Sequence, residues 1–74
     1  MGEASCIGVV GIGKLGLPLA LCIEKAGFNV IGMDIREDYV KQLQKRNFQS
    51  EEPYVNEFLR DASRFSATTS LQEV

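Results

Sequence analysis

Short apolar runs and helical repeats alternate along the chain. The β-branched run Cys6–Val10 ends in glycines and predicts a buried strand. From Leu15 onward the apolar positions are spaced three and four residues apart, which predicts a helix with one inward face. Gly27 follows this helix at the position where glycine commonly ends one. The predicted inward face consists of Leu15, Leu19, Cys22, Ile23 and Ala26.

A second strand and a second helix follow in the same order. Residues 29–34 are again mostly apolar and predict a buried strand that ends in Asp34. Residues 37–46 predict a helix with Val40 and Leu43 turned inward and with cations toward its end, where they suit the helix dipole.

The next segment repeats this order once more. Pro53 favours the first turn of a third helix, and residues 64–69 predict a third short strand. The apolar positions of that helix are Val55, Phe58, Leu59 and Ala62. Strands that alternate with helices predict an α/β fold whose parallel strands are joined by crossover connections.

Charge and composition exclude several classes of protein. The chain of 74 residues has a formal net charge of -2 and no basic cluster, which argues against binding to nucleic acid or to an anionic membrane surface. The longest apolar stretch, residues 15–23, contains Pro18 and is far shorter than the roughly 20 residues of a membrane helix. We therefore expect no nucleic acid partner and no membrane segment.

Cysteine and histidine usage points to a reducing compartment. The sequence has no histidine and two cysteines, which is too few ligands for a zinc site and too few thiols for a disulfide framework. Cys6 and Cys22 lie in apolar surroundings and are predicted to be small core residues. Because no secretory signal is visible, we expect a cytoplasmic protein that has no metal site.

A glycine-rich motif of the form G-x-G-x-x-G carries the candidate chemistry. It follows the first predicted strand and opens the first predicted helix, and Asp34 ends the next strand about 20 residues later. Together these features predict a Rossmann-type three-layer fold with a partial parallel sheet of about three strands in the order 3-2-1. The candidate cofactor-binding residues of the motif are Gly11, Ile12, Gly13, Lys14, Leu15 and Gly16.

Each glycine of the motif has a separate physical role. Gly11 permits the tight turn, Gly13 lets the backbone approach a pyrophosphate, and Gly16 allows the helix to pack closely on the strand. The amides that follow would face the phosphates from the positive end of the helix dipole. Asp34 would accept hydrogen bonds from the adenosine ribose and repel a 2′-phosphate, so the predicted cofactor is NAD rather than NADP.

Two cations near this motif have several interpretations. Arg36 is included among the cofactor-binding candidates because it could stack near the adenine, although it could also accommodate a 2′-phosphate or remain a solvated side chain. Lys14 is expected to point into solvent above a backbone that contacts the phosphates.

With these residues placed, the chain resembles the N-terminal NAD-binding domain of the UDP-glucose/GDP-mannose dehydrogenase family. The resemblance covers residues 7–74 and rests on residues 11–20 and 26–34, on Glu52-Pro53 ahead of Glu57-Phe58-Leu59, and on Ala67-Thr68-Thr69. The chain departs from the usual family pattern at three positions. Lys14 replaces an aromatic residue, Tyr54 replaces a glycine, and Tyr39 replaces a basic residue found in many members.

The resemblance implies a two-step oxidation of a nucleotide sugar's C6 alcohol to a carboxylate, with NAD as the acceptor. Family members use a cysteine nucleophile and a lysine that lie well downstream, so we expect no catalytic residue in this chain. Other NAD-dependent dehydrogenases, of the hydroxyacid or 6-phosphogluconate type, share part of the motif. A non-catalytic nucleotide-binding module is a further alternative.

The end of the sequence suggests a truncated domain. Ser70 and Glu73 have the spacing of a capping box, which marks the start of a helix one residue before the chain stops. We therefore expect residues 1–74 to be the N-terminal part of a dinucleotide-binding domain, without its remaining strands and without a substrate domain. The first strand would then have an open edge, which favours self-association.

Overall fold

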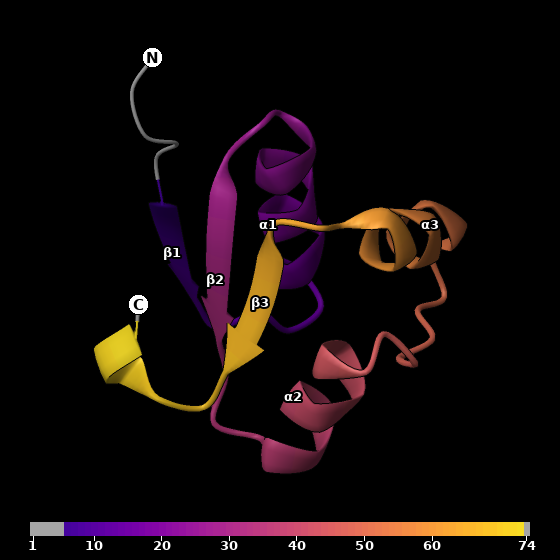
Figure 1. The fold of residues 1–74 in the computed structure, drawn as a ribbon. Helices are drawn as coiled ribbons and strands as arrows, with labels where there is room; N and C mark the ends of the chain where they lie inside the picture. The colour runs from indigo at the N-terminus through magenta and orange to yellow at the C-terminus, as the bar shows by residue number, and fades with distance from the viewer. Residues whose placement is uncertain (1–5, 74) are drawn as a thin grey trace.

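Three parallel strands form the centre of the computed structural model, which describes residues 6–73 (Figure 1). β1 (Cys6–Val10) pairs with β2 (Asn29–Met33), and β2 pairs with β3 (Phe65–Thr68). The order β1-β2-β3 confirms the predicted 3-2-1 arrangement. Because all three strands are parallel, their carboxyl ends lie at one edge of the sheet.

The helices occupy the connections between the strands. α1 (Gly16–Lys25) joins β1 to β2, while α2 (Glu37–Gln44) and α3 (Pro53–Asp61) both lie between β2 and β3. α1 contacts all three strands and α3, and α2 contacts β3 (Figure 1). The described residues therefore form two of the three predicted layers. A short 3-10 helix, η1 (Leu71–Glu73), follows β3 where the capping-box spacing predicts a helix start.

The element boundaries differ from the predicted ones by only a few residues. β2 ends at Met33, so that Asp34 is the first residue after the strand. α2 ends two residues before the predicted position, because Arg46 has a φ of 61° and cannot continue a right-handed helix. Gly27 has a φ of 111° and donates its N–H to the carbonyl of Glu24, which confirms its predicted role in ending α1.

The apolar core lies between the sheet and the helices. The register of the β2–β3 pair places Val30 beside Phe65, and both side chains are buried on the face that the helices cover. Val40 and Leu43 are buried as predicted. The core cluster consists of Ile12, Leu17, Ala20, Leu21, Val30, Val40, Leu43, Val55, Leu59, Ala62, Phe65 and Ala67.

The predicted inward face of α1 is wrong. Leu15 and Leu19 are exposed, and Leu17, Ala20 and Leu21 are buried instead. The reason is that α1 is apolar on both faces, so the spacing of apolar residues cannot determine which face meets the sheet. Cys22 and Ala26 are also exposed, and Ile23 alone of the predicted set packs against the core.

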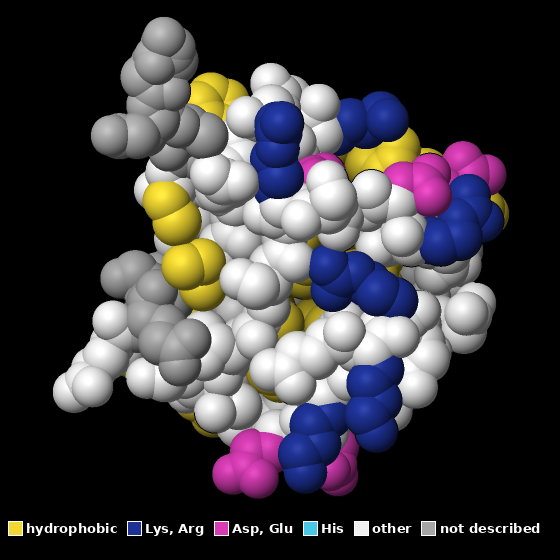
Figure 2. All heavy atoms as spheres, viewed as in Figure 1, with side chains coloured by type: hydrophobic (Ala, Val, Ile, Leu, Met, Phe, Trp, Pro, Cys, Tyr) yellow, Lys and Arg dark blue, Asp and Glu magenta, His cyan; other side chains and the backbone are white. Residues whose placement is uncertain are grey.

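The predicted burial of the two cysteines is also wrong. Cys6 and Cys22 are both exposed free thiols. Cys6 lies on β1, which pairs only with β2 among the described residues and is only partly covered, so the expectation of a fully buried first strand fails as well. Figure 2 shows apolar side chains along the edge of the molecule where β1 lies.

Within residues 6–73, no helix is both long enough and apolar enough to cross a bilayer.

Arg46 connects the ends of three elements. Its guanidinium donates hydrogen bonds to the carbonyls of Leu43 at 2.8 Å, Ala62 at 2.9 Å and Phe65 at 2.7 Å. These carbonyls belong to α2, to the residue after α3 and to β3. Burial lowers the pKa of Arg46 from its ordinary value, but the guanidinium remains charged. The side chain therefore ties the C-terminal ends of α2 and α3 to the start of β3.

We expect Arg46→Met to lower the free energy of unfolding of the full-length protein by about 1–3 kcal/mol, because three carbonyls lose a charged donor. Urea denaturation measures the change. Arg60→Met is the matched control, since Arg60 forms an exposed ion pair with Asp61 at 3.2 Å and should leave the transition unshifted. Equal shifts for both variants would contradict the role of Arg46.

Candidate dinucleotide-binding site

The glycine motif forms a tight turn between β1 and α1, as predicted. Gly11 has a φ of 86°, a conformation that favours glycine, and its N–H donates to the carbonyl of Met33 at 2.8 Å. A Cβ added at Gly16 would stand 1.9 Å from the Gly11 carbonyl oxygen. The first turn of α1 can therefore lie directly on the end of β1 only because residue 16 has no side chain.

The residues between these glycines face different environments. The Ile12 side chain is completely buried, and its methyl groups would lie within 3 Å of a Cβ placed at Gly32. Only the backbone of Ile12 is therefore left to face a ligand. Lys14 and Leu15 are exposed at the start of α1, whose first N–H groups donate to no capping side chain. The N–H groups of Leu15 and Gly16 thus lie at the positive end of the helix dipole, whereas the N–H of Leu17 donates to the Gly13 carbonyl at 3.0 Å and Pro18 has no N–H.

Gly13 leaves open space beside the turn. The nearest atom to a Cβ placed there would be the terminal guanidinium nitrogen Nη2 of Arg36, at 3.2 Å. A pocket of about 620 Å³ extends from this point and is bordered by Gly13, Lys14 and Arg36 together with Tyr39, Phe48 and Tyr54. That volume is within the usual range for small-molecule sites.

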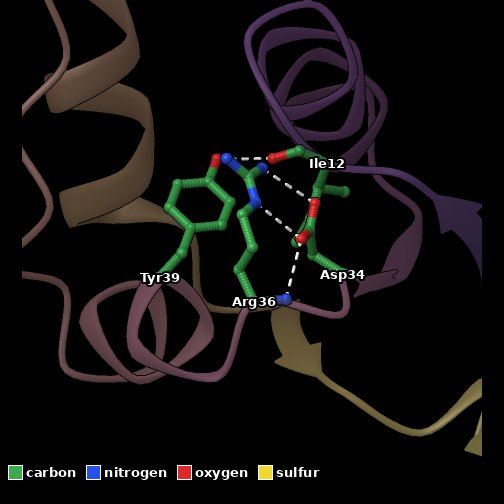
Figure 3. A network of polar contacts seen from close by, with 4 residues as sticks. All are labelled: Ile12, Asp34, Arg36 and Tyr39. Atoms are coloured by element: carbon green, nitrogen blue, oxygen red, sulfur yellow. Dashed lines mark hydrogen bonds and ion pairs between the residues drawn. The ribbon is translucent and has the colours of Figure 1, made fainter.

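Asp34 stands at the carboxyl edge of the sheet, one strand away from the glycine turn. Its N–H donates to the carbonyl of Thr68 at 3.1 Å, which extends the pairing of β2 with β3 by one residue. Its carboxylate is nearly buried and accepts three hydrogen bonds from Arg36: from Nε at 2.8 Å, from Nη2 at 2.9 Å and from the backbone N at 3.0 Å (Figure 3). Asp34 and Arg36 were each expected to bind the cofactor, but the sequence did not predict that they pair with one another.

Tyr39 completes the network and was also missed as a site residue. Its ring lies 4.3 Å from the guanidinium carbon of Arg36, and its hydroxyl donates to the carbonyl of Ile12 in the glycine turn (Figure 3). The signal in the sequence is the three-residue spacing of Arg36 and Tyr39 at the start of a helix, which places them on one face. Phe48 supports the ring in an edge-to-face contact at 5.1 Å.

The network determines the charge state of the site. The hydrogen bonds and positive charge of Arg36 lower the pKa of Asp34 from 3.8 to about 2, although burial acts in the opposite direction. Burial raises the pKa of Tyr39 above its ordinary value. At neutral pH the site therefore contains a carboxylate paired with a guanidinium beside a protonated phenol. Within residues 6–73, no group of three or more potential metal ligands occurs.

A strand-turn-helix unit with a glycine turn and an acid at the next strand end defines a Rossmann-type dinucleotide-binding fold. The family model for the NAD binding domain of the UDP-glucose/GDP-mannose dehydrogenase family matches residues 5–74. The chain belongs to this family, and the matching domain is the one that binds NAD.

The curated proteins that are similar in sequence are nucleotide-sugar dehydrogenases. The chain is 39% identical over 54 residues to a UDP-N-acetyl-D-mannosamine dehydrogenase from Methanococcus vannielii and 40% identical over 52 residues to one from Methanocaldococcus jannaschii. These alignments cover 73% and 70% of the chain but only 13% and 12% of the relatives. The chain thus spans about an eighth of the length of these relatives.

Solved structures show the same architecture. A UDP-glucose dehydrogenase from Pyrobaculum islandicum matches with a TM-score of 0.85 at 27% identity, covering 96% of this chain and 17% of that one. A GDP-mannose dehydrogenase from Pseudomonas aeruginosa matches with a TM-score of 0.83 at 26% identity, covering 90% and 16%. All these matches are to nucleotide-sugar dehydrogenases, which favours that class over the hydroxyacid and 6-phosphogluconate alternatives.

The ion pair predicts an acid-dependent loss of stability. Because the folded-state pKa of Asp34 lies below its ordinary value, the stabilisation is present above about pH 4 and is lost as the pH falls toward 2. Asp34→Asn removes the titrating group, so the difference in unfolding free energy between wild type and variant should shrink over this window. Urea denaturation at several pH values measures it. A difference that stays constant from pH 5 to pH 2 would contradict the assignment.

Proposed function

We propose that this chain holds the pyrophosphate and the adenosine ribose of NAD within a nucleotide-sugar dehydrogenase. The observation that carries the proposal is the position of the Gly11–Gly16 contact, which brings the uncapped first turn of α1 to the sheet edge where Asp34 also lies. The proposed contacts use the backbone of the turn and two side chains. They are made by Gly11, Ile12, Gly13, Lys14, Leu15, Gly16, Asp34 and Arg36.

The residues present fit a diphosphate. Gly13 has no side chain to block an approaching group, and the N–H groups of Leu15 and Gly16, which precede the paired N–H of Leu17, can donate to phosphate oxygens. Lys14 adds a positive charge beside them. Because the pKa of Asp34 is lowered to about 2, its carboxylate is anionic near neutral pH and can accept hydrogen bonds from ribose hydroxyls.

For the whole protein we propose oxidation of a nucleotide sugar's C6 alcohol to a carboxylate, on a UDP-glucose, UDP-N-acetylhexosamine or GDP-mannose type of substrate. When bound, NAD supplies the hydride acceptor for this chemistry. The role of the present residues is to bind and orient the adenosine half of the cofactor, and none of them is proposed as catalytic. In this proposal residues 1–74 form the N-terminal part of the dinucleotide-binding domain, and the nucleotide sugar is bound elsewhere in the protein.

NAD titration of the full-length protein tests this function. Gly13→Ala should weaken NAD binding tenfold or more, because a Cβ occupies the space that the diphosphate needs. Its effect on stability should be smaller than that of Gly16→Ala, since the only close atom is the terminal Nη2 of the Arg36 side chain, which need shift by only a few tenths of an ångström. Asp34→Ala should also weaken NAD binding, through loss of the ribose acceptor.

The control for Gly13→Ala is Gly16→Ala, which places a Cβ against the rigid Gly11 carbonyl and should lower the stability itself. Unchanged NAD affinity in both Gly13→Ala and Asp34→Ala would contradict the proposed site. Equal affinity of the wild type for NAD and NADP would contradict the preference for NAD.

We also infer that the 74-residue chain associates with itself through the open edge of β1. The strand pairs on one side only among residues 6–73, and Val10 at its end is 61% exposed. Val10→Lys should therefore lower the average mass of the chain in sedimentation equilibrium, whereas Gln42→Lys on the exposed side of α2 should not. A wild-type chain that remains monomeric at high concentration would argue against this interface.

We further propose that the protein works in the cytoplasm. Cys6 and Cys22 are free and exposed, and exposed thiols persist most readily in a reducing compartment. Fractionation of cells that produce the full-length protein tests the location.

A further inference from the structure

The peptide between Ile12 and Gly13 is the part of the glycine turn that depends on a side chain for its hydrogen bond. The Ile12 carbonyl accepts the hydroxyl of Tyr39 (Figure 3). The rest of the turn is held by the backbone, since the N–H of Gly11 donates to the end of β2 at 2.8 Å and the Gly13 carbonyl accepts from α1 at 3.0 Å. Within residues 6–73, the N–H of Gly13 donates to no backbone carbonyl, so it remains available to a ligand.

Glycine at residue 13 gives this peptide the freedom to rotate. A trans peptide moves as one planar unit, with its C=O and N–H pointing in opposite directions. Because glycine adopts positive and negative φ about equally well, the Ile12–Gly13 peptide can turn over with little steric cost at residue 13. The missing Cβ that leaves room for a diphosphate therefore also leaves the direction of the Gly13 N–H unspecified, unless the Ile12 carbonyl is held in place.

Tyr39 is fixed firmly enough to hold that carbonyl. Its ring packs edge-to-face on Phe48 at 5.1 Å, and the guanidinium carbon of Arg36 lies 4.3 Å from the centre of the ring. Arg36 is fixed in turn by two side-chain hydrogen bonds to Asp34. Burial raises the pKa of Tyr39, so the hydroxyl keeps its proton near neutral pH and remains a donor. The hydroxyl therefore ends a continuous chain of contacts that connects α2 to the turn.

We propose that Tyr39 is a positioning residue for the diphosphate: its hydroxyl holds the Ile12–Gly13 peptide in the orientation that directs the Gly13 N–H at a phosphate oxygen. In this role Tyr39 contacts the turn and not the cofactor. The inference rests on the proposed NAD function and deepens it, because it explains how a turn that glycine makes flexible is prepared before NAD arrives. A turn that alternates between two orientations binds more weakly, in proportion to the fraction of molecules in the competent one.

Tyr39→Phe in the full-length protein tests the proposal, because it removes the hydroxyl and keeps the ring that contacts Phe48 and Arg36. The Kd for ADP should rise about three- to tenfold, as expected when roughly a tenth to a third of the molecules keep the competent orientation. The Kd for NAD should rise with it. Adenosine has no phosphate and should bind the variant within about twofold of the wild type, because its ribose reaches Asp34 and not the turn. Calorimetric titration gives the constants for ADP and NAD, and displacement of NAD gives that for adenosine.

The comparison of ADP with adenosine separates positioning from general damage to the site. A variant that merely loosens the packing would lose affinity for both ligands, since Arg36 packs on the same ring and also pairs with Asp34. Phe48→Leu is the second variant, because it weakens the packing around Tyr39 and keeps the hydroxyl. It should lower the affinity for ADP less than Tyr39→Phe does, and the reverse order would overturn the inference.

Tyr54→Phe is the matched control, since it removes the hydroxyl of the other tyrosine in the chain. Tyr54 lies in α3, where its ring packs on Phe58 at 5.8 Å, and the variant should keep the constants for ADP and NAD within about twofold of the wild type. Unchanged ADP affinity in Tyr39→Phe, or equal losses of ADP and adenosine affinity, would overturn the inference while NAD binding by the wild type upholds the proposed function. Binding of neither NAD nor ADP by the wild type would overturn both.

Discussion

The close approach of α1 to the end of β1 is the constraint on which the other features of the site depend. A Cβ at Gly16 would stand 1.9 Å from the Gly11 carbonyl oxygen, so the contact exists only with glycine at residue 16. This contact determines how α1 is rotated about its axis. It therefore buries Leu17 and Leu21 against the sheet, leaves Leu15 exposed, and brings the N-terminus of α1 to the edge where the strands end.

The second constraint is electrostatic and acts between neighbouring loops. Asp34 leaves β2 at the same edge as the glycine turn, and Arg36 and Tyr39 connect its carboxylate to the Ile12 carbonyl inside that turn. The pair keeps Asp34 ionised and also occupies most of its acceptor positions. A ligand that binds this carboxylate must therefore compete with an internal cation.

The two-layer architecture explains where the apolar surface remains. The helices cover one face of the sheet, and β1 pairs only with β2 in the part of the chain that the structure describes. The second apolar face of α1 and the end of β1 are therefore accessible, with Leu15, Leu19 and Val10 exposed. Exposed apolar side chains gathered in this way commonly mark a surface that other protein segments contact.

Local patterns in the sequence determined the order of the elements, the parallel sheet and the glycine turn. Strand and helix periodicities depend on neighbours a few residues apart, and the motif of Gly11, Gly13 and Gly16 specifies a backbone geometry that only glycine permits. Asp34 was recognised for the same reason, because its spacing from the motif follows from the length of one helix and one strand.

Only the tertiary structure decided which face of α1 is buried, whether the cysteines are covered, and which residue pairs with Asp34. α1 is apolar on both faces, so its rotation follows from a contact with Gly11 five residues away in the turn rather than from its own pattern. The link from Tyr39 to the Ile12 carbonyl joins residues 27 positions apart. Contacts of this kind depend on how the elements pack in space, and local sequence periodicity carries no information about them.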